Sequence, residues 1–184
     1  MTEAASLSIA RPDHILSIAS PEHIEAADFL AREAEMLDDL REREWLETLV
    51  SKDIVYQVPL RETVERARGR GFVEGTYHLN ENYGSLSSKV ARNETKYAWA
   101  EDPPSRLRHF VTNVRVRRHE DPNQLLVRNN LLIYRTRQDQ TTPQILAGER
   151  QDVLRREDGG LRLLGRVVLL DMTVIGTHNL SLFF

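Results

Sequence analysis

Four polar residues in the second half of the sequence have side chains of the kind that acid–base catalysis uses. They are His109, Tyr134, Asp152 and Asp171, and all lie in segments whose apolar pattern is typical of strands. If they point into one pocket, a His–Asp or Tyr–Asp pair there could abstract a proton. The other interpretation is that they are satisfied buried polar groups or members of interface ion pairs. We favour this second interpretation, because charged residues make up 29% of the chain and polar side chains on its strands are therefore common.

The histidine pattern argues against a metal site. A non-haem iron site needs two histidines and one carboxylate on one face. The sequence has six histidines: His14, His23, His78, His109, His119 and His178. No two of them have HxxxH or HExxH spacing. The chain has no cysteine, which excludes disulfides, thiolate zinc sites, a cysteine nucleophile and Rieske iron–sulfur clusters. We therefore expect this chain to hold no metal and no cofactor.

Two further motifs are interpreted as surface features. Gly69-Arg70-Gly71 with Gly75 resembles a phosphate loop, but its spacing is wrong and it lies in an arginine-rich segment. The basic run Arg115–His119 alternates between strand faces and lacks interleaved aromatics, so a solvated face or a protein interface fits it better than nucleic acid. A net charge of -3 and a pI of about 6.1 also argue against nucleic-acid binding.

The bulk properties are those of one ordinary globular domain. The 184 residues include 40% hydrophobic residues, and no apolar run approaches the roughly 20 residues that cross a bilayer. The N-terminal segment has acidic Glu3 and no long apolar stretch, so it is not typical of a signal peptide. We expect a mobile arm over residues 1–19, a single domain over residues 20–184, and a cytoplasmic protein without membrane contact.

The first half is expected to be mainly helical. Ser20-Pro21 is a helix start signal, followed by a second short helix over residues 41–50. A short strand is expected over residues 54–58, then a loop over residues 62–75 and a helix over residues 79–90. The first helix should bury the apolar residues that recur at three- and four-residue steps, namely Ile24, Ala27, Leu30, Ala34 and Leu37.

The second half is expected to be an antiparallel meander. Four strand-like segments, separated by turn signals, cover residues 107–118, 125–137, 145–156 and 161–173. Short turns require antiparallel neighbours, and Arg162 and Arg166 should share one face of the last strand. Helices followed by such a sheet indicate an α+β fold, in which the sheet curls around the helices as a cone with a pocket.

Several ordered segments resemble the small (β) subunits of aromatic-ring-hydroxylating dioxygenases. The resemblance covers about residues 24 to 184, and its most specific part is the stretch AWAEDPPSRLRH at residues 98–109 with the strand that follows it. The other matching segments are Phe29–Ala34, Val58–Thr63, Gly148–Arg155, Leu169–Asp171 and the tail Asn179–Phe184. One departure is Gln57, where relatives often have a bulky aromatic residue; the arginine-rich loop from Thr63 to Gly75 looks individual to this protein.

The resemblance implies a cystatin-like, nuclear transport factor 2-like α+β cone. It also implies a large α subunit that holds a Rieske [2Fe-2S] cluster and a mononuclear iron, in an assembly of three α and three β chains. The complex would insert both atoms of O2 into an arene to give a cis-dihydrodiol in aromatic catabolism, with electrons from NAD(P)H through a reductase. The β subunit would be structural, so no catalytic residue is carried over. The alternatives are a free-standing isomerase, dehydratase or cyclase on the same cone, or a small-ligand binder.

Five residues are candidates for a subunit interface. Trp99 lies next to a proline-rich turn, and Arg106 and Arg108 should point to the same side of the strand that follows. Tryptophan and arginine dominate interface hot spots, and two phenylalanines, Phe183 and Phe184, would be unusual if left in water. The alternatives are that the phenylalanines close the chain's own core and that the arginines form salt bridges within the chain, to Glu101, Glu149 or Asp152.

Overall fold

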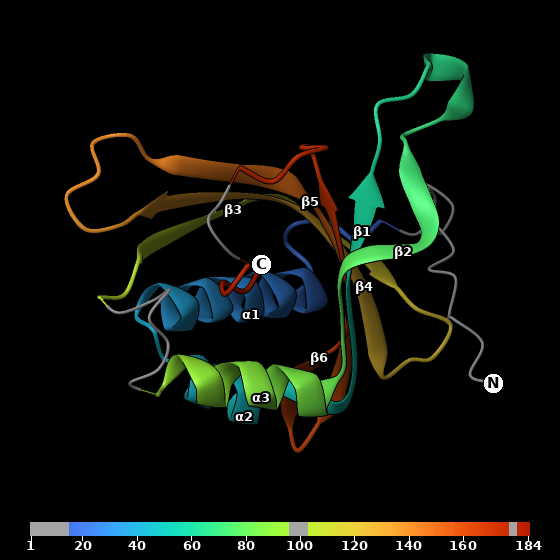
Figure 1. The fold of residues 1–184 in the computed structure, drawn as a ribbon. Coiled ribbons are helices and arrows are strands. Elements are labelled where there is room, and N and C mark those ends of the chain that lie inside the picture. Colours follow the sequence, from blue (N-terminus) through green and yellow to red (C-terminus); the bar gives the residue numbers. More distant parts are fainter. Residues whose placement is uncertain (1–14, 96–102, 177–179) are drawn as a thin grey trace.

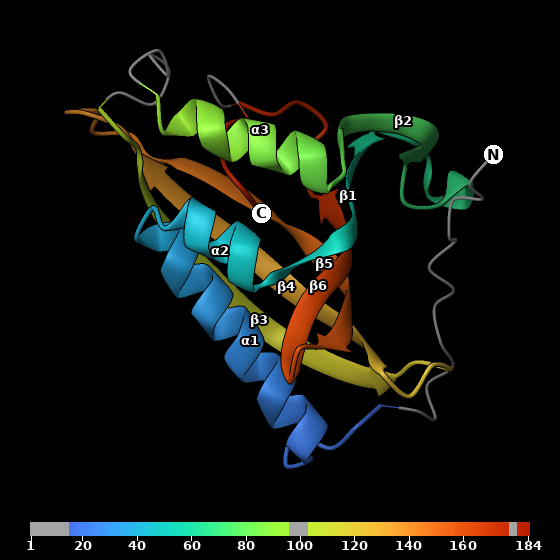
Figure 2. The same cartoon turned by 90° about the horizontal axis from the view of Figure 1, so that it is seen from below.

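A computed structural model describes residues 15–95, 103–176 and 180–184 of the chain. Within these ranges the chain forms three α-helices and one six-stranded sheet. The sheet is strongly curved, and the helices cover its concave face (Figure 1; Figure 2). The α+β prediction is therefore confirmed. The first fourteen residues of the expected N-terminal arm lie outside the described part, and Ile15 forms an isolated bridge with Arg117.

The first two helices form where the sequence predicts them. Helix α1, Pro21–Asp38, begins at Ser20, whose side chain accepts a hydrogen bond from the backbone N–H of His23 at 3.2 Å. Helix α2, Glu42–Thr48, is shorter than expected because Val50 already begins strand β1. The buried face of α1 is rotated from the predicted one: Ile24 is exposed, while the face packed on the sheet carries Ala26, Phe29, Leu30, Glu33, Met36 and Leu37.

The segment between α2 and α3 differs most from the prediction. Strand β1, Val50–Arg61, continues through Pro59, because the register with its neighbour shifts there and the missing N–H leaves no gap in the ladder. Strand β2, Phe72–Glu81, occupies part of the predicted loop and of the predicted helix. Helix α3, Tyr83–Asn93, starts only after Asn82, which forms a capping box with Ser85.

The last four strands form the predicted meander. They are β3 (Arg106–Arg118), β4 (Gln124–Thr136), β5 (Gln144–Glu157) and β6 (Gly160–Leu170). Each pairs antiparallel with the next, and β6 ends at Leu170, before the predicted Thr173. Register shifts mark bulges in β3 between Thr112 and Arg115 and in β6 between Leu163 and Gly165, and bulges bend and twist a strand.

The strand order is β2-β1-β6-β5-β4-β3, so the first strand lies beside the last. The β1–β6 pair is parallel, which the sequence analysis did not predict. The apolar core fills the space between the helices and the concave face of the sheet. In β4 the inward side chains are alternate residues, among them Leu125, Val127, Leu131 and Ile133. This alternation also carries polar residues into the interior, where they form the cluster described next.

Candidate functional site

A cluster of charged side chains lies in the centre of the cone. Glu33 from α1 accepts hydrogen bonds from Arg166 of β6 at 2.8 Å and from Arg150 of β5 at 3.1 Å. Asp152 of β5 accepts from the Arg166 Nε at 2.7 Å, and Asn129 of β4 links Arg150 to Asp152. The four charged side chains are at most 2% exposed. We refer to Glu33, Asn129, Arg150, Asp152 and Arg166 as the buried ion cluster.

The sheet register explains why these residues meet. Asn129 pairs with Arg150 across β4 and β5, and Asp152 pairs with Arg166 across β5 and β6, so all four side chains share the concave face. Glu33 lies on the helix face that packs there, and Trp45 donates its indole N–H to the Glu33 carboxylate at 3.0 Å. The expectation that Arg166 shares a face with Arg162 is wrong, because the β5–β6 register shifts between Leu163 and Gly165 and the extra residue reverses the alternation. Arg162 lies on the outer side, beside Glu157 and Asp158, whereas Arg166 is fully buried.

Electrostatics favour the charged forms of Glu33 and Arg166 in the buried ion cluster. Burial by itself raises the pKa of the Glu33 carboxyl, but the charges of Arg166 and Arg150 outweigh it, so this pKa lies below its ordinary value. Burial lowers the pKa of the Arg166 guanidinium, but Asp152 and Glu33 raise it well above its ordinary value. Two carboxylates and two guanidinium groups therefore neutralise one another. The lowered pKa of Glu33 and the raised pKa of Arg166 both favour the charged forms of these two side chains.

The C-terminal residues close the cone over this cluster. Phe183 is 2% exposed and Phe184 is fully buried. The Phe183 ring packs on Trp45 with ring centroids 4.7 Å apart, and the backbone N–H of Phe184 donates to the Tyr56 hydroxyl at 2.7 Å. Lys89 donates to the carbonyl oxygen of Leu182 at 2.8 Å. Both phenylalanine side chains thus lie in the chain's own core, which is the alternative stated for them.

The four acid–base candidates are not gathered in one pocket. His109 is buried, with its Nδ1 2.6 Å from Asp38 Oδ1 and its Nε2 3.1 Å from the carbonyl oxygen of Phe183. Asp152 belongs to the buried ion cluster. Tyr134 is 41% exposed, and Asp171 is exposed and paired with Arg61 at 3.2 Å. The interpretation as satisfied buried polar groups is therefore confirmed for His109 and Asp152, and Tyr134 and Asp171 lie outside the cone.

The two predicted interface arginines are exposed, as expected, and lie on the same side of β3. Arg106 donates to the hydroxyl of Thr136 at 3.2 Å and to the carbonyl oxygen of Gln138 at 2.6 Å. Arg108 is 64% exposed and pairs with Asp38 at 3.3 Å. Asp38 was not among the partners that the sequence suggested, because it lies at the far end of α1. Trp99 lies outside the described residues.

A group of exposed apolar side chains on the outer face of the sheet was not predicted. Phe110 is 52% exposed and pairs with Leu132 across β3 and β4, while Tyr134 is 41% exposed and pairs with Ile145 across β4 and β5. We call these four residues the outer-face patch. The signal for it is present in the sequence, since residues 131–134 are apolar at every position rather than at alternate ones, which is typical of a strand covered on both faces.

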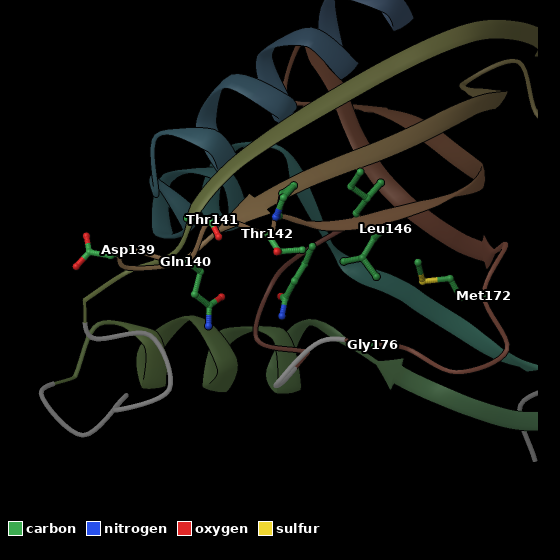
Figure 3. A pocket seen from close by; sticks show the side chains of 10 residues that line it. Asp139, Gln140, Thr141, Thr142, Leu146, Met172 and Gly176 are labelled. Carbon is green, nitrogen blue, oxygen red and sulfur yellow. The ribbon is translucent and has the colours of Figure 1, made fainter.

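Two hollows flank the ends of the cone. One, of about 670 Å³, lies between the β4–β5 turn and the segment after β6, with Asp139 and Gln140 towards one end and Met172 at the other (Figure 3). Its single titratable lining residue is Asp139, so it offers no acid–base pair. Another, of about 390 Å³, lies between the α1–α2 turn and Leu182.

The described ranges contain neither a metal-ligand cluster nor a helix that could span a membrane. No three histidine, aspartate or glutamate side chains come together there as a metal site would require. None of the helices described there has both the length and the apolar character needed to cross a bilayer.

Comparison with known proteins gives consistent matches. The family model for ring-hydroxylating β subunits matches residues 32–177. A chain of naphthalene 1,2-dioxygenase, solved with indole bound in the active site, has a TM-score of 0.78 and 30% identity, covering 88% of this chain and 84% of that one. The β subunit of benzoate 1,2-dioxygenase from Burkholderia mallei has a TM-score of 0.65 and 22% identity, covering 85% of this chain and 93% of that one.

Proposed function

The chain belongs to the family of ring-hydroxylating dioxygenase β subunits, and on this premise we propose that it is a non-catalytic structural subunit of an α3β3 oxygenase. The family membership and the cone fold both agree with the resemblance seen in the sequence. In the proposed assembly the large α subunit holds the Rieske [2Fe-2S] cluster and the mononuclear iron. The complex dihydroxylates an aromatic compound in the cytoplasm.

The filled interior of the cone is the observation that supports a non-catalytic role most strongly. An enzyme built on this fold needs a pocket with an acid or base that is free to react. Here Glu33 and Asp152 are committed to Arg150 and Arg166, and the tail that contains Phe183 covers them. This arrangement favours the structural subunit over the isomerase, dehydratase or cyclase alternative.

The outer-face patch supports a subunit contact. Clustered exposed apolar side chains are uncommon on monomeric proteins and typical of surfaces that another chain covers. Phe110 and Tyr134 are aromatic, and Arg108 pairs directly with Tyr134 across β3 and β4. Aromatic residues next to arginine are the composition of interface hot spots. In the proposed assembly the large subunit is the chain that covers this patch.

Co-expression of this chain with a dioxygenase large subunit tests the proposal. We expect copurification with a particle mass that fits three copies of each chain, and a brown iron–sulfur chromophore that travels with the large subunit. The isolated chain should oxidise no arene and should carry no iron in metal analysis after gel filtration. A monodisperse monomer of this chain in the presence of the large subunit would contradict the proposal.

A patch variant and a control variant distinguish a specific role of the outer-face patch in assembly from a general effect of adding surface charge. Tyr134→Lys with Ile145→Lys should abolish copurification while the isolated chain stays folded, since both residues are already exposed. Ile24→Lys is the matched control, because Ile24 is 58% exposed but lies on α1. Loss of assembly in the control alone would place the interface on the helical side instead.

A further inference from the structure

The hairpin that joins β1 to β2 carries exposed arginines away from the body of the protein. A short 3-10 helix, Arg66–Arg68, forms its end, and the hairpin projects beyond the sheet (Figure 1). Arg66 and Arg68 are exposed at this end, and we refer to them as the arginine tip. This surface has no role in the fold's core and none in the buried ion cluster.

The backbone at the base of the hairpin has a closely defined conformation. The backbone N–H of Glu62 donates to the carbonyl oxygen of Gly71 at 2.7 Å, and Arg61 pairs with Phe72 in the β1–β2 ladder. Gly71 has a φ of +79°, and a Cβ there would lie 2.2 Å from the Glu62 carbonyl oxygen. Only glycine fits this position, so the chain direction at the base is closely defined.

Side chains at the base tie the hairpin to the sheet. Arg61 donates to the carbonyl oxygen of Leu170 at 3.0 Å, and its guanidinium lies 5.2 Å from the Phe72 ring centroid. Arg70 lies over the same ring and pairs with Glu149 of β5 at 3.4 Å. In the part of the chain that the structure describes, the Arg66 and Arg68 side chains form no hydrogen bond or ion pair. The hairpin is therefore anchored at its base and presents two uncommitted guanidinium groups at its end.

The charge of the hairpin is opposite to that of the whole chain. Residues 61–72 contain four arginines and two glutamates, whereas the chain as a whole has a net charge of -3. Nucleic acid and anionic membranes are poor partners for such a molecule, because its acidic body is repelled by a dense phosphate surface. A protein surface with carboxylates fits better, since a guanidinium can grip a carboxylate with two parallel hydrogen bonds.

Arg70, at the base of the hairpin, connects the hairpin with the outer-face patch. Arg70 lines a groove of about 720 Å³ together with Phe110 and Leu132. A partner that covers the patch would therefore also reach the base of the hairpin. We propose that the arginine tip docks on an acidic surface of the large subunit and steers its association with this chain. This inference rests on the proposed function, because it takes the large subunit as the chain that covers the patch.

The test measures assembly with the co-expressed large subunit as a function of salt. Arg66→Glu with Arg68→Glu should weaken the association about tenfold at low ionic strength and flatten its salt dependence, as expected for charges at an interface rim. Arg66→Lys with Arg68→Lys keeps the charge and should retain most of the affinity. Arg32→Glu with Arg92→Glu is the matched control, since both arginines are exposed on the helical side and the charge change is the same. The melting temperature of each isolated variant should equal that of the wild type.

The outcomes separate this inference from the proposed function. If the wild-type chain assembles and the Glu variant has the same affinity and salt dependence, the inference is overturned and the proposed function stands. If the wild-type chain does not assemble, both are overturned. Binding of DNA or anionic vesicles that depends on Arg66 and Arg68, with assembly unchanged, would also overturn the inference.

Discussion

Glu33 and Arg166 form a direct ion pair at the centre of the cone, with Oε2 and Nη2 2.8 Å apart, although 133 residues separate them in the chain. Both side chains are fully buried. Arg166 simultaneously grips Asp152 with two hydrogen bonds, at 2.7 and 3.0 Å. One buried guanidinium thus joins helix α1 to strands β5 and β6. Removing or neutralising the Arg166 side chain should therefore destabilise the whole domain.

Glu33→Gln should be strongly destabilising. The change leaves Arg150 and Arg166 with one carboxylate between them, and breaking a buried ion pair by removing one partner costs about 3–5 kcal/mol. Urea unfolding of the isolated chain measures the effect. Glu35→Gln is the matched control, because Glu35 lies on the same helix but is exposed and 3.6 Å from Arg41. Equal stability of the two variants would show that the buried ion cluster contributes little.

Stability should fall in acid, in part through Glu33. The pKa of its carboxyl is lower in the folded chain than the ordinary 4.5, so the unfolded chain binds more protons over that interval. This contribution is present above about pH 4.5 and is lost as the pH falls through the folded-state pKa. Unfolding free energies measured between pH 6 and pH 3 should therefore decline more steeply for the wild type than for Glu33→Gln. A parallel decline of the two proteins would assign the acid sensitivity to other carboxylates.

Lys89 should make the stability rise with pH in the alkaline range. Burial lowers its pKa from the ordinary 10.5 to about 8, so between these values the unfolded chain binds a proton that the folded chain has released. The contribution of Lys89 to stability should therefore rise as the pH increases from about 8 to 10.5. Lys89→Met should remove this rise, although it also removes the hydrogen bond to the carbonyl of Leu182. The measurement is the pH dependence of the unfolding free energy relative to wild type.

Phe184→Ala should destabilise the isolated chain by about 3–5 kcal/mol, as expected for a fully buried phenylalanine. The bonds of Phe184 to Tyr56 and Arg166 involve backbone atoms, so they can persist and the effect reports on packing. Benzene should bind the cavity and raise the melting temperature of this variant alone. Phe110→Ala, at an exposed position, should leave melting unchanged and instead weaken copurification. The reverse pattern would exchange the core and interface roles of these two residues.

Arg106→Ala with Arg108→Ala should impair assembly with little effect on folding. Arg108 pairs with Asp38 but is 64% exposed, and exposed pairs contribute about 1 kcal/mol or less. Melting of the isolated chain and copurification with the large subunit are measured side by side. Full assembly together with a large loss of stability would make these arginines intrachain supports, which is the alternative stated from the sequence.

Local signals account for most of what the sequence predicts correctly. The meander follows from turn residues such as Asp158 and Gly159, and α1 follows from the Ser20 cap, because a turn or a cap depends on neighbours in the chain. Strand β2 could not be predicted in this way. Its residues from Phe72 onwards lie at the edge of the sheet and are only partly buried, so they lack a clear apolar alternation, and pairing with β1 decides their state.

The buried contacts inside the cone were harder to predict than the helices and strands that surround them. A glutamate on an amphipathic helix is ordinarily solvated, and only the folded arrangement shows that Glu33 faces two arginines from distant strands. The position of the tail depends in the same way on Trp45 and Tyr56. The outer-face patch, in contrast, could have been found from its uninterrupted apolar run at residues 131–134.

The parallel pairing of β1 with β6 has a consequence for how the chain is made. Val55 pairs with Gly165, so β1 leaves the ribosome long before its partner on that side exists. Until β6 is made, the edge of β1 that pairs with it has unpaired backbone groups, and such edges pair readily with other chains. Contacts of this sequence separation also slow folding, because loop-closure entropy opposes them until late. We expect newly made chains to depend on chaperones or on prompt synthesis of the last strand, and truncation before β6 to give aggregation rather than a smaller folded unit.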